Sequence, residues 1–128
     1  MSERALTRVL YAEDEPDIRE VALLALVDVG GLEVVACENG LDALRKVADF
    51  APDLILLDVM MPDMDGPTTM KHLREREETK TTPVIFMTAK VQAHEAAEYQ
   101  ALGAAGVIPK PFDPMTLADQ IREVWSKR

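Results

Sequence analysis

An aspartate at the end of an apolar segment is the residue of this chain that points most directly to chemistry. Asp58 follows the segment Leu54-Ile55-Leu56-Leu57. A buried carboxylate costs free energy unless a partner or a reaction compensates for its charge. Candidate partners follow two other apolar segments: the acidic pair Glu13 and Asp14 near the N-terminus, and Lys110 near the C-terminus. Together these residues predict an aspartate that accepts a phosphoryl group.

The residue types expected around Asp58 also suit a metal ion. Glu13, Asp14 and Asp58 cannot crowd together without a compensating positive charge. A hard divalent cation with oxygen ligands supplies that charge, and Mg²⁺ fits best. Lys110 can pair with a carboxylate or with a phosphoryl oxygen, and the Thr88 hydroxyl can donate to a second phosphoryl oxygen. Phosphoryl transfer mainly requires positioning and charge neutralisation, which these groups supply.

Five short apolar segments precede the candidate site residues and predict strands. We expect the strands at residues 7–12, 33–37, 53–57, 83–87 and 105–109. The third is apolar throughout, which is typical of a central strand covered on both faces. Strands that alternate with helices predict an α/β fold with a parallel sheet and helices on both faces. Ligands bind beyond the carboxyl ends of such strands, so the candidate residues should meet at one end of the sheet.

The segments between the expected strands carry helix signals. The first helix should begin at Pro16 and end at Gly30-Gly31, and Asn39 should cap the second. The third should begin near Gly66-Pro67, and the fourth should span residues 92–102. Asp113-Pro114 should begin the fifth. Apolar residues at helical spacing predict the buried faces: Ile18, Val21, Ala22 and Ala25 in the first helix, Leu41, Leu44 and Ala48 in the second, Met70 and Leu73 in the third, and Leu117, Ile121 and Val124 in the fifth.

Composition limits what the chain can bind. Its 128 residues predict one domain with a core of its own. The formal net charge of -9 argues against direct nucleic-acid binding and suits cations or basic protein surfaces. No apolar stretch is long enough to span a membrane, and the single Cys37 allows no intramolecular disulfide. We therefore expect a cytoplasmic protein.

Four motifs in this order resemble the receiver domain of two-component response regulators. They are Glu13-Asp14-Glu15, the segment from Asp58 to Gly66, Thr88-Ala89 and Lys110-Pro111-Phe112. The resemblance covers residues 1–128 as a single receiver domain. It implies a flavodoxin-like, doubly wound sheet with the strand order 2-1-3-4-5. It also implies that a sensor histidine kinase or a phosphotransfer protein donates a phosphoryl group to Asp58.

The resemblance assigns metal ligands to particular residues. Asp14 and Asp58 would bind Mg²⁺ directly, Glu13 would bind it through water, and the backbone carbonyl of Met60 would complete the protein ligands. Glu13 stands where the family commonly has aspartate, and its longer side chain still permits a contact through water.

The resemblance also assigns switch residues. Thr88 would move towards the phosphoryl group and Lys110 would bridge to it, while the bond from Lys110 to Pro111 would be cis. The family usually has an aromatic residue three positions before the lysine, where this chain has Val107. Phosphorylation must therefore reach the surface by another route.

Two positions tune how long the phosphoryl group survives in the family, and here they hold Met60 and Lys90. An apolar Met60 offers no group to orient an attacking water, so we expect slow loss of the phosphoryl group. The partner-binding surface would lie at residues 90–125, including Lys90, Val107 and Phe112. It would bind a downstream protein rather than nucleic acid or membrane, as a monomer or as a dimer that forms on phosphorylation.

Three other functions compete with the phosphoryl-accepting switch. A phosphatase of the haloacid dehalogenase type would need a second acid two residues after the nucleophile, where this chain has Met60. A flavin-binding domain of similar topology would need a glycine-rich phosphate loop after the first strand, which is lacking. A receiver-like docking module that is never phosphorylated would not need Asp58, Thr88 and Lys110 together.

Overall fold

Strands and helices alternate along the chain. The structure, a computed structural model, describes residues 4–89 and 92–128. Its strands are β1 (Arg8–Ala12), β2 (Glu33–Cys37), β3 (Leu54–Asp58), β4 (Val84–Thr88) and β5 (Gly106–Pro109). Its helices are α1 (Pro16–Leu23), continued by the π-helical segment η1 (Leu24–Val29), then α2 (Gly40–Phe50), α3 (Gly66–Arg74), α4 (Ala93–Ala101) and α5 (Leu117–Lys127). Within the described ranges, no helix combines the length and apolar character needed to cross a bilayer.

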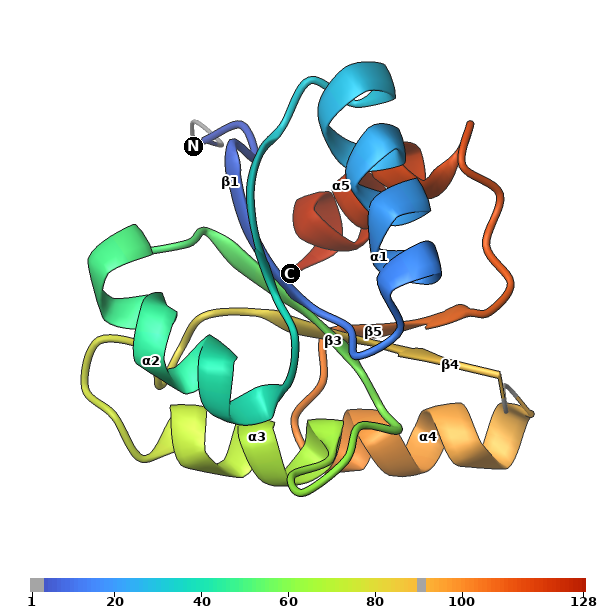
Figure 1. Cartoon of the computed structure of the whole chain (residues 1–128). Helices are drawn as coiled ribbons and strands as arrows, with labels where there is room; N and C mark the ends of the chain where they lie inside the picture. The colour runs from blue at the N-terminus through green and yellow to red at the C-terminus, as the bar shows by residue number, and fades with distance from the viewer. Residues whose placement is uncertain (1–3, 90–91) are drawn as a thin grey trace.

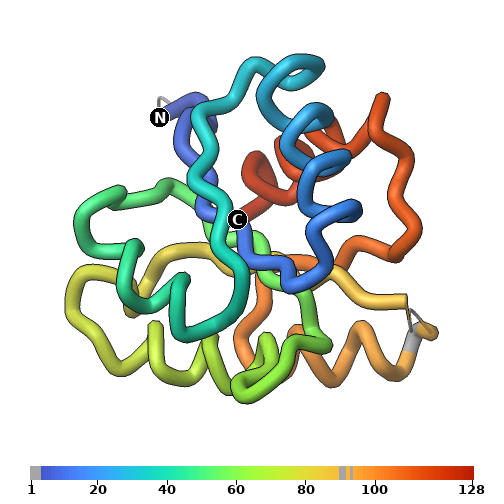
Figure 2. Tube along the Cα trace, viewed as in Figure 1, coloured from blue at the N-terminus to red at the C-terminus, as the bar shows by residue number. Residues whose placement is uncertain are grey.

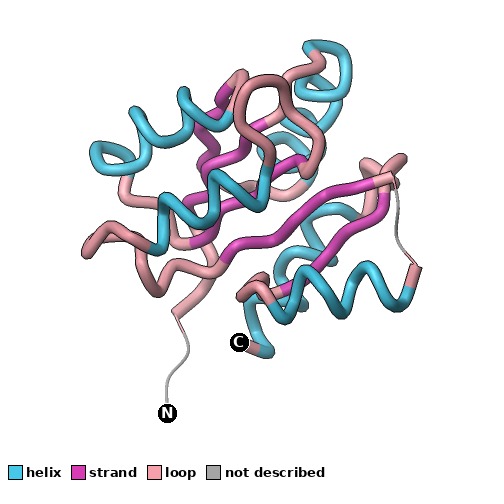
Figure 3. Tube along the Cα trace, turned by 90° about the horizontal axis from the view of Figure 1, so that it is seen from below, coloured by secondary structure: helices cyan, strands magenta, loops and turns pink. Residues whose placement is uncertain are grey.

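The strands form one parallel sheet in the order β2-β1-β3-β4-β5, which confirms the predicted topology. Helices α1 and α5 cover one face, and α2, α3 and α4 cover the other (Figure 1). The same two layers are visible in the Cα trace (Figure 2), and the strands run side by side between them (Figure 3). The fold is therefore the flavodoxin-like, doubly wound α/β fold.

The core is divided by the sheet because side chains alternate along each strand. In β1, Val9 and Tyr11 belong to the apolar cluster beneath α1 and α5, whereas Leu10 and Ala12 belong to the cluster beneath α2 and α3. Strands β3 and β4 are buried along their whole length, as expected of central strands. This alternation also decides on which face each site residue lies.

Two predicted helix faces were partly wrong. Val21 is 42% exposed and Leu41 is 57% exposed, and Ala48 also lies at the surface. The buried stripe of α2 consists of Ala43, Leu44, Val47 and Phe50. The large side chains of Val47 and Phe50 decide which face of α2 turns inward, and Leu41 then falls on the opposite side. In the first helix the small residues Ala22 and Ala25 face the sheet and permit close packing.

The last helix begins later than predicted. The carbonyl of Asp113 accepts hydrogen bonds from the N–H groups of Thr116 and Leu117, and its side chain accepts one from Met115 N–H at 2.9 Å. Residues 114–116 therefore form a turn before α5 rather than its first turn. The predicted buried stripe holds, since Leu117 and Ile121 are fully buried and Val124 packs against the same core cluster.

The loop after β3 folds back on the strand end that carries Asp58. Gly66 N–H donates to the carbonyl of Val59 at 2.9 Å, and the Asp65 side chain caps α3 by accepting from Thr68 N–H at 2.8 Å. A Cβ atom on Gly66 would lie 2.6 Å from the Asp58 carbonyl oxygen and 3.1 Å from Val59 Cα. Only glycine permits this contact, which holds the end of β3 in place.

We therefore expect Gly66→Ala to destabilise the protein, because backbone atoms must move to admit the methyl group. The expected loss in the free energy of unfolding is about 1–3 kcal/mol. Urea unfolding followed by the fluorescence of Trp125, the single tryptophan, measures it. Thr68→Ala, at an exposed position in the same helical turn, is the control. Equal stability of Gly66→Ala and the wild type would contradict this account of the loop.

Candidate functional site

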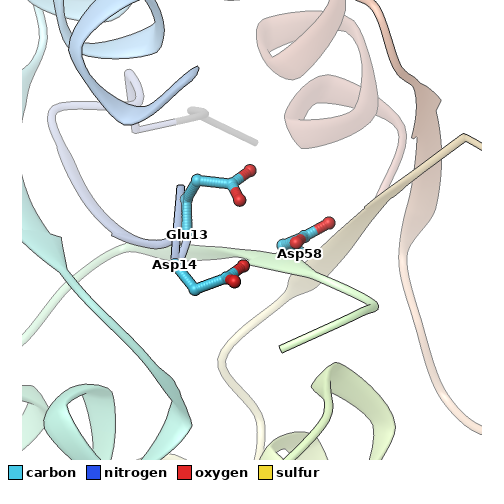
Figure 4. Close-up of side chains that lie close together, drawn as sticks. All are labelled: Glu13, Asp14 and Asp58. Atoms are coloured by element: carbon cyan, nitrogen blue, oxygen red, sulfur yellow. The ribbon is translucent and has the colours of Figure 1, made fainter. Parts of the chain in front are cut away.

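Three carboxylates meet beyond the ends of β1 and β3. Ala12 in β1 is paired with Leu57 in β3, so the residues that follow them lie side by side. Oxygen atoms of Glu13, Asp14 and Asp58 lie within 4.8 Å of one another. Glu13 and Asp14 extend from the end of β1 towards Asp58 (Figure 4). The sequence prediction that these acids converge is confirmed.

A lysine from the far end of the chain joins the carboxylates. The Nζ atom of Lys110 lies 3.0 Å from Glu13 Oε1 and 3.1 Å from Asp58 Oδ1. Its side chain is only 14% exposed, and the Glu13 side chain is completely buried. The backbone N–H of Lys110 donates to the carbonyl of Thr88 at 2.9 Å, and the peptide bond to Pro111 is cis, as expected. One ammonium group therefore serves two buried carboxylates.

Burial and mutual repulsion act on the charges of this cluster. Burial raises the pKa of Glu13 to about 7, and the charge of Asp58 adds to this, although hydrogen bonds from Lys110 and from the N–H of Glu15 oppose the shift. Burial also raises the pKa of Asp58, with a contribution from Asp14, against the opposing effect of Lys110. Both carboxylates therefore bind protons more readily than they would in water.

Lys110 keeps its charge despite its surroundings. Burial would lower the pKa of Lys110, but the hydrogen bonds to Glu13 and Asp58 outweigh it and raise the pKa. One ammonium faces three carboxylates, so the site lacks positive charge. Crowded oxygen ligands with a deficit of positive charge are the donor set that a hard divalent cation prefers. Glu13, Asp14 and Asp58 could hold a metal ion.

Thr88 lies at the same end of the sheet but turns to the other face. It is the last residue of β4, buried to 3% exposure, and it alternates with Met87, which packs beneath α1 and α5. On that face, Tyr99 of α4 packs with its ring edge-on to Phe86 of the same strand, with centroids 5.3 Å apart. The Thr88 side chain therefore faces the layer that contains α4, whereas the alternation along β3 turns Asp58 towards α1 and α5.

The remaining predicted residues surround this group less closely. Met60 is 72% exposed and lines a pocket together with Asp14 and Asp65. Val107 is paired with Phe86 across β4 and β5 and is partly buried. Lys90 falls outside the described residues.

Two contacts of the site were missed from the sequence. The guanidinium of Arg19, in α1, donates to the backbone carbonyl of Glu13 at 2.7 Å and fixes the turn that carries the acids. The sequence offers only a weak signal for this contact, namely that Arg19 lies six residues after Glu13. The contact of Tyr99 with Phe86, which lies two residues before Thr88 in β4, had no such signal, because it depends on how α4 packs against the sheet.

We expect Lys110→Met to destabilise the protein in the absence of divalent cations, because two buried carboxylates lose their shared partner. Removing one partner of a buried pair costs several kcal/mol, and with Lys110 slightly exposed we expect about 2 kcal/mol. Glu13→Gln in the same protein should restore part of the loss. Urea unfolding at neutral pH measures both variants.

The matched control is Lys80→Met, which breaks an exposed ion pair with Glu77. It should cost at most about 1 kcal/mol, because water screens such pairs. If Lys110→Met were no more destabilising than Lys80→Met, the charge balance inferred for the site would be wrong.

Comparisons with known proteins agree with the fold. The family model of the response regulator receiver domain matches residues 9–122. Regulatory protein AtoC of Escherichia coli is 38% identical over 109 residues, or 85% of this chain and 23% of AtoC. Protein PilG of Pseudomonas aeruginosa is 33% identical over 115 residues, or 90% of this chain and 84% of PilG. The structure of Vibrio cholerae chemotaxis protein CheY4 matches with a TM-score of 0.85 and 34% identity, covering 94% of this chain and 99% of that one.

These similarities identify the family of the chain but not the downstream process that it controls. The chain spans 23% to 52% of the length of the AtoC and PhoB regulators that it matches. Receiver domains are signalling switches rather than enzymes with a free substrate, and they imply a histidine kinase as the class of partner. The match therefore favours a receiver over the phosphatase considered from the sequence. With its acidic cluster, sheet order and relatives in agreement, the chain belongs to the response regulator receiver domain family.

Proposed function

We propose that Asp58 accepts a phosphoryl group from a phosphohistidine of a sensor histidine kinase or a phosphotransfer protein. The observation that carries this proposal is the buried Asp58 carboxylate with the Lys110 ammonium 3.1 Å from its Oδ1. A carboxylate oxygen of Asp58 attacks phosphorus and forms a P–O bond. The P–N bond to the donor imidazole breaks, and its electron pair returns to the ring nitrogen.

Lys110 and Thr88 position and neutralise the phosphoryl group in this proposal. The ammonium of Lys110 already lies beside Asp58, so it can pair with a phosphoryl oxygen after a small movement. The hydroxyl of Thr88, at the end of the next strand, donates a hydrogen bond to another oxygen. Both groups act on negative charge that is present only when a phosphoryl group has arrived.

We assign the cation of the site as Mg²⁺. Asp14 and Asp58 would hold it directly, Glu13 through water and Met60 through its backbone carbonyl. The oxygen-only donor set and the shortage of positive charge beside Lys110 support this assignment. When bound, Mg²⁺ supplies positive charge that offsets the carboxylates and the incoming phosphoryl oxygens.

Phosphorylation then changes which proteins the domain binds. We propose that residues 1–128 act as one receiver domain in the cytoplasm and that its response surface lies at residues 90–125. A downstream protein with a basic surface suits the net charge of -9 better than nucleic acid does. The domain would act as a monomer or as a dimer that forms on phosphorylation.

Acetyl phosphate with Mg²⁺ should give a single phosphoryl adduct on the wild-type protein, because Asp58 needs only a small activated donor. Intact-mass measurement detects the adduct, and Asp58→Ala should lack it. Asp14→Asn should form it at least about tenfold more slowly, since charge neutralisation is the main contribution to this chemistry.

Asp63→Asn is the control, because it removes one charge from an exposed position in the loop after β3 and asparagine tolerates its left-handed φ of 69°. Release of many equivalents of phosphate would support a phosphatase instead. Absence of any adduct, with acetyl phosphate or with a kinase donor, would support a docking module that is never phosphorylated.

We expect Met60→Asn to shorten the half-life of the adduct, because an amide can orient an attacking water and the exposed thioether cannot. A full general base raises the rate of such a reaction a hundredfold or more, so a group that only orients the water should shorten the half-life about tenfold. Loss of the adduct over time, followed by intact mass, measures the half-life. Met115→Asn changes another exposed methionine and should leave it unaltered. Equal half-lives for Met60→Asn and the wild type would rule out this role of Met60.

A further inference from the structure

A tyrosine side chain lies in the core next to the carboxylate cluster. Tyr11 of β1 is fully buried in the apolar cluster beneath α1 and α5. It lies two residues before Glu13, and it is paired across the sheet with Leu56, which lies two residues before Asp58. The N–H of Glu13 donates to the Cys37 carbonyl at 3.0 Å and so continues the ladder between β1 and β2. Because side chains alternate along a strand, Tyr11 points to the same face of the sheet as Glu13 and Asp58.

The Tyr11 hydroxyl is buried and has no hydrogen-bond partner among residues 4–89 and 92–128. Buried polar groups are nearly always hydrogen-bonded, and a buried donor without an acceptor costs free energy. Phenylalanine would fill the same space without this cost. Burial raises the pKa of Tyr11, and the negative charges of Glu13 and Asp58 raise it further against a smaller effect of Arg19. The hydroxyl therefore keeps its proton and can donate.

One oxygen of Glu13 depends on Lys110 for its donor. The Lys110 ammonium lies 3.0 Å from Glu13 Oε1 and 3.1 Å from Asp58 Oδ1, so it holds both carboxylates in the resting protein. Glu13 Oε2 accepts instead from the N–H of Glu15 at 3.3 Å. A phosphoryl group on Asp58 would draw the ammonium towards its own oxygens. Glu13 Oε1, on a completely buried side chain, would then need another donor.

We propose that Tyr11 is a positioning residue of the phosphorylation site, whose hydroxyl donates to Glu13 when Lys110 turns to the phosphoryl group. This inference rests on the proposed phosphorylation of Asp58. The hydrogen bond would hold the Glu13 carboxylate where it can contact the hydrated cation. Glu13 is the acceptor rather than Asp58, because the oxygens of Asp58 would then be engaged by the cation and by phosphorus.

The unpaired hydroxyl would favour the phosphorylated state over the resting one. The resting protein contains a buried donor without an acceptor, whereas the phosphorylated protein gains a hydrogen bond to a charged group. A bond of this kind shifts an equilibrium at least about tenfold. The same gain applies while the phosphoryl group is arriving, because its oxygens already attract Lys110. Tyr11 would therefore speed phosphorylation of Asp58 without contacting the phosphoryl group.

Tyr11→Phe tests this role, because it keeps the ring and removes only the hydroxyl. Without a phosphoryl donor, the variant should bind Mg²⁺ like the wild type. Without Mg²⁺, it should unfold at the same urea concentration as the wild type or at a higher one. With acetyl phosphate and saturating Mg²⁺, intact-mass measurements should show the adduct forming about tenfold more slowly. A purely structural role would instead lower the stability of the variant.

Two further variants test the specificity of the effect. Glu13→Ala removes the proposed acceptor, so adding Tyr11→Phe to it should not slow the reaction further. Thr79→Val is the control, since it also removes a buried hydroxyl. The Thr79 hydroxyl donates to the Leu73 carbonyl at 2.6 Å in the segment before β4, whereas the site lies beyond the ends of the strands. Thr79→Val should therefore lower stability and leave the rate of adduct formation unchanged.

Three results would overturn the role of Tyr11. They are a resting Tyr11→Phe that is less stable than the wild type, adduct formation in Tyr11→Phe at the wild-type rate, and equal slowing by Tyr11→Phe with and without Glu13. Each of them requires that the wild type form the adduct. A wild-type protein that forms no adduct would refute the proposed function itself.

Discussion

The structure depends on a shortage of positive charge at one end of its sheet. Three carboxylates lie within 4.8 Å of one another, and two of them are fully or almost fully buried with one lysine between them. Such an arrangement is unfavourable by itself, since burial raises the pKa of both Glu13 and Asp58. The same shortage favours binding of a cation, and a cation together with Lys110 would then offset the negative charge that a phosphoryl group brings. The carboxylate cluster therefore lowers the stability of the resting protein and at the same time provides a binding site.

The parallel sheet brings this cluster together from distant parts of the chain. Glu13 and Lys110 are 97 residues apart in sequence, yet their side chains are paired at the carboxyl ends of β1 and β5. The alternation of side chains places Asp58 and Lys110 towards α1 and α5, while Thr88 turns towards α4. A phosphoryl group at Asp58 would thus lie between residues that face the two layers.

Much of this could be predicted from the sequence. The apolar segments gave the strands, and the polar residues that follow them gave Glu13, Asp14, Asp58 and Lys110, because parallel strands end at a common side of the sheet. Helix faces were less certain: Leu41 and Val21 fit a helical period but lie at the surface, since larger or better placed neighbours occupy the interior. The contact between Tyr99 and Phe86 could not be predicted, because it depends on the packing of α4 and not on spacing along the chain.

Calorimetric titration with Mg²⁺ tests the central claim most directly. It measures binding of the cation that the charge deficit should attract, and it requires neither a phosphoryl donor nor a kinase. The account predicts one binding site in the wild-type protein, lost or weakened at least about tenfold in Asp14→Asn and retained in Asp63→Asn, since only the first removes a charged oxygen ligand from the cluster. Absence of Mg²⁺ binding by the wild type, or equal binding by Asp14→Asn, would contradict it.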